Sequence, residues 1–534
     1  MKLNYAIKKN QVSLFIFLLF IEPAIAQNFQ TVVGGVNEEY SNSIIHAFDG
    51  GYIMTGTTLS YGGMPGITED IYVVKTDSLG TVEWTRSFGN ADNDEALWIE
   101  PYLDKTYLIC GTTFSSGGTI ASMFVMRLDL YGTILSLQQF SGFGREEANC
   151  IRATNDKGYV VAGQTSDGLN DRFCVVKCDS LGTIQWSKAF SGPDQQDAFY
   201  VTQTSDSGYL VAGTSRYINN WYSLYLVKLD SSGNFMWSKM YNTDPYKSKC
   251  FVSRVLQTQD GGYILNGSSN ALGQPLTDVM LLKLDSAGNI LWQKVYEGND
   301  SEFGNDIYED GNTGFIICGQ TASTSASGYY DAMLMKTDLN GNLLWTKAYG
   351  VNDSDEVFNS MLHTPDDKIV LTGYSYINSA GESDVYLFET SKEIDSMECN
   401  IKFPNFLVDT ISLIAMTVNY SVPCTITQSN LSFGVDSGFN ESLICSQVLG
   451  VSENNLQGDF DIYPNPSNGI LNVYQHAMNE NYKLEIYNAP GEKFYSGDIH
   501  FGNNNIDLNN FPGGVYLLVI SSGSETIFRK LVIS

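Results

Sequence analysis

Acidic side chains recur in this sequence at one place of a repeated pattern, ten or eleven residues after a position that is usually Trp. Carboxylate oxygens gathered on one face would attract a cationic ligand or hold Ca²⁺, the one cofactor that such a ring suggests. A structural role is the alternative, in which the carboxylates accept hydrogen bonds from turn N–H groups and lock neighbouring repeats together. The acids are Glu39, Asp94, Glu95, Glu146, Glu147, Asp197, Glu302, Asp355 and Glu356.

Aromatic side chains gather in loops that differ from repeat to repeat. Aromatic faces beside carboxylates and Asn suit sugar rings, whose C–H faces stack on them. Ordinary packing within the loops is the other interpretation. Variable loops on a rigid scaffold are where recognition is usually located. The candidate ligand-binding residues are Tyr217, Trp221, Tyr222, Tyr329, Tyr330, Tyr374 and Tyr376.

Signs of catalysis are few. His46 and His363 occupy the same repeat position, which indicates a polar slot at a strand end. No GxSxG, HExxH or P-loop sequence is present, and no CxxC or EF-hand spacing indicates a metal site. Paired carboxylates could serve glycosidase chemistry, but the acids are too frequent for a pair to be chosen. We name no catalytic residue.

The composition narrows the classes of protein that need considering. The 534 residues carry 30 Lys and Arg against 59 Asp and Glu, a net charge of -29, which argues against a nucleic-acid partner. Fifty Gly and 32 Tyr, with 43% hydrophobic residues, favour a well-packed all-β protein.

The N-terminus has the features of a secretory signal peptide. Three lysines precede the apolar run VSLFIFLLFI, and AIA ends at residue 26 as a small-x-small cleavage site. We expect residues 1–26 to be removed. No later apolar run is long enough to span a bilayer, so we expect no transmembrane segment after cleavage.

Seven units with a period near 53 residues follow. A strand ending in Gly, such as GGYIMTG or KGYVVAG, recurs with terminal glycines at 56, 111, 163, 213, 267, 319 and 373. A second strand, such as YVVKTDSLG, runs into an Asp-x-x-Gly turn, and a strand beginning with Trp follows in most units. Four short strands per unit, repeated seven times, predict a seven-bladed β-propeller over residues 27–394.

The two ends of the repeat predict how the ring closes. The seventh unit stops after its third strand, Val385–Thr390, and Phe29–Val33 matches the Trp84 strand in register. We therefore expect the N-terminal strand to be the outer strand of the seventh blade, a "Velcro" closure that leaves no open blade.

Residues 395–450 leave the repeat and hold strand-like runs. We interpret them as a small β module or docking segment, ending in a polar linker. The chain has nine cysteines, an odd number, so they cannot all pair with one another. One disulfide among Cys399, Cys424 and Cys445 is one possibility, and the pairing stays open.

The last residues, 459–534, alternate short strands with Pro, Gly and Asn turns, which predicts a small Ig-like β-sandwich. The motifs YPNP with a following Gly, PGGVY and the terminal KLVIS resemble the type A C-terminal sorting domain of type IX secretion substrates of Bacteroidota. The motif residues are Tyr463, Pro464, Asn465, Pro466, Gly469, Gly513, Gly514, Tyr516 and Lys530. The repeat region is similar to propeller cargo of the same bacteria.

That resemblance implies an export route. The type IX machinery would be the partner, and the product would be secreted or attached to the outer-membrane surface. We therefore expect a non-catalytic propeller that binds a glycan or a surface protein. A secreted glycan-degrading enzyme and a structural surface scaffold are the alternatives.

Overall fold

The computed structural model describes the chain from residue 28 onward in ranges with gaps. The described ranges are 28–114, 120–142, 144–166, 170–190, 195–217, 221–242, 249–270, 276–325, 327–351, 354–376, 382–392, 401–402, 404, 407–409, 414–417, 427–430, 434–436, 440–447, 460–463, 469–475, 482–488, 493–508, 511–512, 514–521 and 526–533. They form two compact units, one up to residue 447 and one after it. The expected signal peptide lies outside the described residues.

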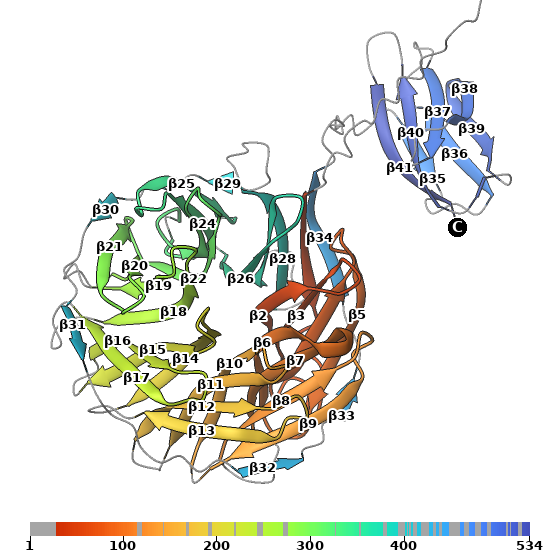
Figure 1. Cartoon of the computed structure of the whole chain (residues 1–534). Coiled ribbons are helices and arrows are strands. Elements are labelled where there is room, and N and C mark those ends of the chain that lie inside the picture. Colours follow the sequence, from red (N-terminus) through yellow and green to blue (C-terminus); the bar gives the residue numbers. More distant parts are fainter. Residues whose placement is uncertain are drawn as a thin grey trace, which may run out of the picture. The chain divides into compact units, whose positions relative to one another are not determined.

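The first unit is built of seven antiparallel sheets arranged around a ring (Figure 1). We call each sheet a blade and its first strand the inner strand. The first three blades consist of β2 (Glu39–His46), β3 (Tyr52–Thr58), β4 (Asp70–Thr76) and β5 (Val82–Gly89); β6 (Asp94–Tyr102), β7 (Thr106–Thr113), β8 (Ser122–Leu128) and β9 (Ile134–Ser141); and β10 (Glu146–Ala153), β11 (Tyr159–Ser166), β12 (Asp171–Cys178) and β13 (Ile184–Phe190).

The remaining blades repeat the pattern. They consist of β14 (Gln196–Gln203), β15 (Tyr209–Tyr217), β16 (Trp221–Leu229) and β17 (Phe235–Asn242); β18 (Cys250–Gln257), β19 (Tyr263–Ser269), β20 (Asp278–Leu284) and β21 (Ile290–Glu297); β22 (Glu302–Glu309), β23 (Phe315–Thr321), β24 (Asp331–Thr337) and β25 (Leu343–Tyr349); and β26 (Glu356–His363), β27 (Lys368–Ser375), β28 (Asp384–Ser391) and β1 (Asn28–Gly34). The single helical turn among the described residues is η1 (Leu103–Lys105).

Local chemistry explains the strand ends. In the Asp-x-x-Gly turn after β4, the Asp77 carboxylate accepts hydrogen bonds from the backbone N–H groups of Leu79 and Thr81, both at 2.9 Å. Gly80 takes a positive φ of 78°, which favours glycine. In the first blade the second and third strands are buried along their whole length, with both faces covered.

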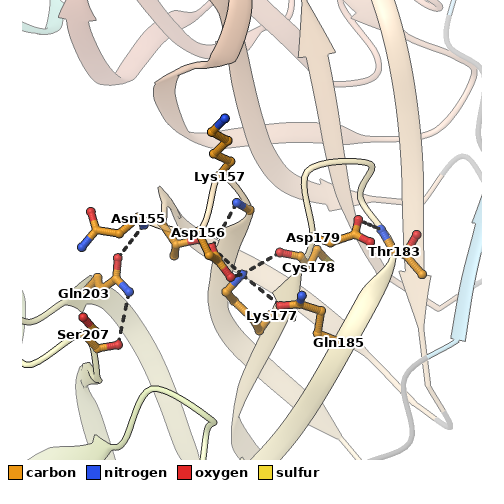
Figure 2. A network of polar contacts seen from close by, with 12 residues as sticks. Asn155, Asp156, Lys157, Lys177, Cys178, Asp179, Thr183, Gln185, Gln203 and Ser207 are labelled. Atoms are coloured by element: carbon orange, nitrogen blue, oxygen red, sulfur yellow. Dashed lines mark hydrogen bonds and ion pairs between the residues drawn. The ribbon is translucent and has the colours of Figure 1, made fainter.

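In most blades an ion pair joins a buried lysine of the third strand to an aspartate in the turn between the first and second strands. In the third blade, the Lys177 ammonium contacts Asp156 at 2.8 Å and also donates to Gln185 and to the Cys178 carbonyl (Figure 2). Equivalent Lys–Asp pairs join Lys75 with Asp49, Lys228 with Asp206, Lys283 with Asp260 and Lys336 with Asp310. The seventh blade reverses the charges, with Lys368 paired to Glu389.

Each inner strand contains a β-bulge at its fourth residue. In four blades this residue is Asn, and its side-chain amide donates to a carbonyl of the next inner strand. Asn149 donates to Ala198 at 2.8 Å, and Asn359 of the seventh blade donates to Ser41 of the first at 3.0 Å. Asn42 and Asn305 make the same bond. The contact between the seventh and first blades is therefore equivalent to the contacts within the repeat.

The expected pairing of the N-terminal strand is confirmed. β1 pairs with β28, with Gln30 opposite Phe388 and Val33 opposite Val385. Phe29 also occupies the place of the repeat tryptophans, because its ring lies against the turn glycine Gly80 as Trp84 lies against Gly132.

The described strands of residues 401–447 each pair with a blade strand and add a fifth strand to six blades. The strands β29 (Ile401–Lys402), β30 (Leu407–Asp409), β31 (Ile414–Thr417), β32 (Thr427–Asn430), β33 (Gly434–Asp436) and β34 (Asn440–Gln447) pair with β25, β21, β17, β9, β5 and β1. We call these strands the belt. It visits the blades in reverse order and ends on the N-terminal strand.

The cysteines of the blades differ from those that follow residue 394. Six of them, Cys110, Cys150, Cys174, Cys178, Cys250 and Cys318, are buried and unbridged. Cys445 lies in β34, whereas Cys399 and Cys424 lie outside the described residues, so their pairing stays a prediction.

The second unit has two antiparallel sheets that share one hydrophobic core. One sheet contains β35 (Phe460–Tyr463), β36 (Ile470–Gln475) and β39 (Gly502–Asp507); the other contains β37 (Tyr482–Asn488), β38 (Lys493–Ile499), β40 (Gly514–Ser521) and β41 (Thr526–Ile533). Leu471 and Val473 of the first sheet pack with Leu484 and Leu518 of the second.

The Asn bridges can be tested by stability. Asn149→Ala and Asn359→Ala should each lower the free energy of unfolding by about 1 kcal/mol, because a buried carbonyl loses its donor. Urea unfolding followed by tryptophan fluorescence measures this, since all seven tryptophans lie in the first unit. Exposed Asn340→Ala is the control. A loss at Asn149 without a loss at Asn359 would show that the seventh and first blades are not joined in this way.

Candidate functional site

The predicted acids that begin inner strands are buried. Glu302 accepts hydrogen bonds from the Thr321 hydroxyl at 2.8 Å and from the Gly298 N–H at 2.9 Å. Glu39 likewise accepts from Thr58 at 2.7 Å and from the N–H of Ser60 at 3.0 Å. Asp94, Glu146 and Glu356 have corresponding partners. These contacts match the structural alternative, in which the carboxylates hold the loops between blades.

A second set of buried acids, which the sequence analysis missed, begins the third strands. Asp70, Asp278, Asp331 and Asp384 are each at most 3% exposed. The carboxyls of Asp384 and Glu39 both lie against Gly34, and those of Asp331 and Glu356 both lie against Gly350. The signal was visible in the sequence, because Asp precedes an apolar strand at the same position of four repeats.

Two of these acids, Asp70 and Asp278, have a pKa well above the usual range of an Asp. Burial, with the nearby Asp94 adding to it, raises the pKa of Asp70 to about 7. Burial, together with Glu302, raises the pKa of Asp278 to about 7. At the junction of the sixth and seventh blades a belt residue supplies a counter-charge, because the Lys402 ammonium lies 2.8 Å from Asp331.

The predicted acids at the second position of inner strands, Glu95, Glu147 and Asp197, are less buried than those at the first position and lie where the channel between the inner strands begins. We call this side of the ring the mouth face; it carries the first residues of the inner strands and the loops between the second and third strands. Burial raises the pKa of Glu95 to about 6, with Glu69 and Glu147 adding to it. Burial also raises the pKa of Asp197 to about 6, with Asp171 and Glu147 adding to it. Arg145 pairs with Glu147.

Three of the predicted aromatic residues, Tyr330, Tyr374 and Tyr376, come together on the mouth face of the sixth and seventh blades, and Tyr329 precedes Tyr330 in the chain. The Tyr374 and Tyr376 rings are 6.4 Å apart at 84°, and Asp355 accepts the Tyr330 N–H at 2.7 Å. Burial raises the pKa of Tyr374 to about 12, with Asp355, Tyr376 and Tyr330 contributing in that order. Tyr329 and Tyr376 are 41% and 42% exposed.

The other predicted aromatics are separate from this group. Tyr222 packs on Phe251 of the next blade, with ring centroids 4.7 Å apart. Tyr217 and Trp221 face each other across the β15–β16 hairpin, and their side chains lie outside the described residues.

The centre of the ring holds a charged cluster that the repeat gave no reason to expect. The fifth residues of four inner strands meet there. Arg254 pairs with Asp306 at 2.7 Å and lies over the Trp98 ring at 4.6 Å, and Trp98 makes an edge contact of 5.3 Å with Tyr200. Beside them Arg152 pairs with Glu100 at 3.1 Å. The sequence signal is the lack of repetition, since this position is Ser43, Trp98, Cys150, Tyr200, Arg254, Asp306 and Ser360 in the seven blades.

The two candidate histidines lie at inner-strand ends. His46 Nε2 is 3.0 Å from the His363 carbonyl, and His363 Nε2 is 2.8 Å from Asp367. His46 therefore contacts the neighbouring blade, and His363 contacts the turn that follows its own strand. Within the described residues no three His, Cys, Asp or Glu side chains are grouped as metal ligands.

The buried Asp residues predict a pH dependence of stability. Folding raises the pKa of Asp70 and Asp278 from 3.8 to about 7, so the folded chain binds more protons between these values. The free energy of unfolding should therefore fall as pH rises from about 4 to 8. Urea unfolding across this range should show a flatter profile for Asp70→Asn and Asp278→Asn than for exposed Asp92→Asn. Identical profiles for all three would contradict the assignment.

Comparison with known proteins identifies the second unit. Residues 461–534 match the family described as "Secretion system C-terminal sorting domain". In that region Tyr516 is buried and its hydroxyl donates to the Pro512 carbonyl at 2.8 Å, which gives the PGGVY motif a structural role. Of the other motif residues, Tyr463 ends β35, Gly514 begins β40 and Lys530 lies in β41, while Pro464, Asn465, Pro466 and Gly513 lie outside the described residues. Gly469 accepts the Leu508 N–H at 2.7 Å.

The whole chain has distant structural likenesses. Polysaccharide lyase Uly1 matches with 10% identity and a TM-score of 0.43, over 67% of this chain and 92% of that chain. Sqt1 from Chaetomium thermophilum matches with 12% identity and a TM-score of 0.38, over 65% and 84%. PorZ, a surface component of the type IX secretion system of Porphyromonas gingivalis, matches with 9% identity and a TM-score of 0.26, over 92% and 81%. These scores carry no argument about function.

No curated protein matches the sequence. Across the parts of the chain that the structure describes, no helix is long and apolar enough to cross a bilayer. Residues 461–534 are a C-terminal sorting domain of the type IX secretion kind, which implies that the chain is exported to the cell surface or beyond.

Proposed function

We propose that the first unit is a seven-bladed β-propeller that binds an extracellular glycan or protein ligand, without catalysis, through the loops of its mouth face. The observation that carries the proposal is the group of Tyr330, Tyr374 and Tyr376 around Asp355, with Tyr329 next to Tyr330 in the chain. Tyr329 and Tyr376 are about two-fifths exposed, although aromatic residues usually bury more of their surface. Aromatic faces with a carboxylate beside them suit the C–H faces and hydroxyls of a sugar.

A secreted glycan-degrading enzyme is the second candidate. Glu95 and Asp197 favour it, because both have a pKa raised to about 6, which is suited to proton transfer near neutral pH. Both carboxyls lie within electrostatic reach of Glu147. Binding followed by turnover of the same glycan would distinguish the enzyme from the binding protein.

Glycan-array binding of the mature chain, with and without Ca²⁺, tests the proposal. Tyr330→Ala and Tyr376→Ala should each weaken a specific hit at least tenfold, because stacking area is lost at the mouth. Tyr131→Ala is the matched control, since Tyr131 is 73% exposed in the turn that ends the third strand of the second blade. Equal binding by all variants would contradict the mouth site, and no hit in either condition would leave a protein partner or a surface scaffold as the function. Loss of binding without Ca²⁺ would support the acidic ring as a cation site.

The assignment of residues 459–534 as a sorting domain predicts that export depends on them. Deleting residues 459–534 should retain the chain inside the cell, because the type IX machinery would no longer recognise it. Fractionation with immunoblotting measures the exported fraction. Deletion of residues 530–534, the terminal KLVIS, should have the same effect, and normal export of both truncations would contradict the assignment.

A further inference from the structure

The channel has a cavity at its other end, where the inner strands finish. Its volume is about 500 Å³, within the usual range of ligand pockets. It is lined by the last residues of the inner strands of four consecutive blades, including Arg152, Thr202, Gln257, Tyr308 and Glu309. The loops of the mouth face take no part in it, so this cavity is independent of the proposed function.

The cavity is built by residues that break the repeat. The seventh residue of the inner strand is apolar in the first and seventh blades, as Ile45 and Leu362. In the four blades around the cavity the same position is Arg152, Thr202, Leu256 and Tyr308. Three of these four side chains carry a polar group, and the position does not repeat from blade to blade.

The charges at the cavity floor are already balanced. Arg152 pairs with Glu100 at 3.1 Å, and behind it Arg254 pairs with Asp306 at 2.7 Å. Glu309 adds a carboxylate at the rim, and the whole chain carries a net charge of -29. An anionic ligand would therefore be repelled, and a cation would meet the nearby guanidinium groups. An uncharged polar ligand fits this balance best.

The lining offers both kinds of contact that a sugar uses. The Arg152 guanidinium has five N–H donors, and Glu100 occupies only part of them while the side chain remains 31% exposed. The ring of Tyr308 is held parallel to His363, with centroids 4.9 Å apart and planes at 13°. Tyr308 and Leu256 thus give the cavity apolar surface beside hydroxyl and amide groups. We infer that this end of the channel binds a neutral saccharide.

Isothermal titration of the mature full-length chain with maltotriose, cellotriose and mannotriose tests the inference, with a triuronate as the charged probe. Thr202→Phe places an aromatic ring in the cavity and should weaken binding of a neutral trisaccharide at least tenfold. Ile45→Phe introduces the same residue at the same strand position outside the cavity. This variant should bind the trisaccharide as the unchanged chain does. Tyr308→Phe removes only a hydroxyl and should weaken binding severalfold, which keeps the test decisive if Thr202→Phe does not fold.

Three outcomes would overturn the inference. These are no binding of any neutral trisaccharide, binding of the triuronate alone, and equal binding by Thr202→Phe and Ile45→Phe. Binding that falls with Tyr330→Ala but not with Thr202→Phe would belong to the mouth face and would also count against the cavity. The two proposals can therefore fail separately.

Discussion

The bulge in every inner strand is the feature on which the rest of the ring depends. One extra residue is left out of register with the second strand and interrupts the regular alternation of side chains. The fourth side chain reaches the neighbouring blade, as Asn149 and Asn359 do. The fifth reaches the centre, as Arg254 and Trp98 do. One local irregularity thus both joins the blades and fills the channel.

Buried charge is handled by strict pairing. Removing Lys177 from water without Asp156 would cost several kcal/mol, so each such lysine has a carboxylate close by. The reversed pair of Lys368 and Glu389 shows that charge balance matters at this position more than which residue carries which sign. The buried carboxyls at the blade junctions also avoid an unpaired charge, either through a lysine or through a raised pKa. Lys402 supplies the counter-charge for Asp331, whereas Asp70 and Asp278 gain a proton more readily than an exposed acid would.

The repeat could be predicted because most blades carry the same glycine, turn aspartate and tryptophan at equivalent positions. The turn aspartates and the match of Phe29 to Trp84 carried enough information to place the N-terminal strand beside β28. The belt could not be recognised as such, because its strands are two to eight residues long and pair with partners far away in the sequence. The central cluster was missed for the opposite reason. Reasoning from repeats treats Trp98 or Arg254 as exceptions, although unrepeated positions are where a single constellation can form.

The placement of β1 between β28 and β34 has a consequence for the timing of folding. The first strand of the ring finds its partners only in residues 384–391 and 440–447, so it cannot pair with β28 or with β34 until those residues have been made. Contacts this distant in sequence are slow to form. Until then the blades form an open row, and the ring closes only late in the synthesis of the chain.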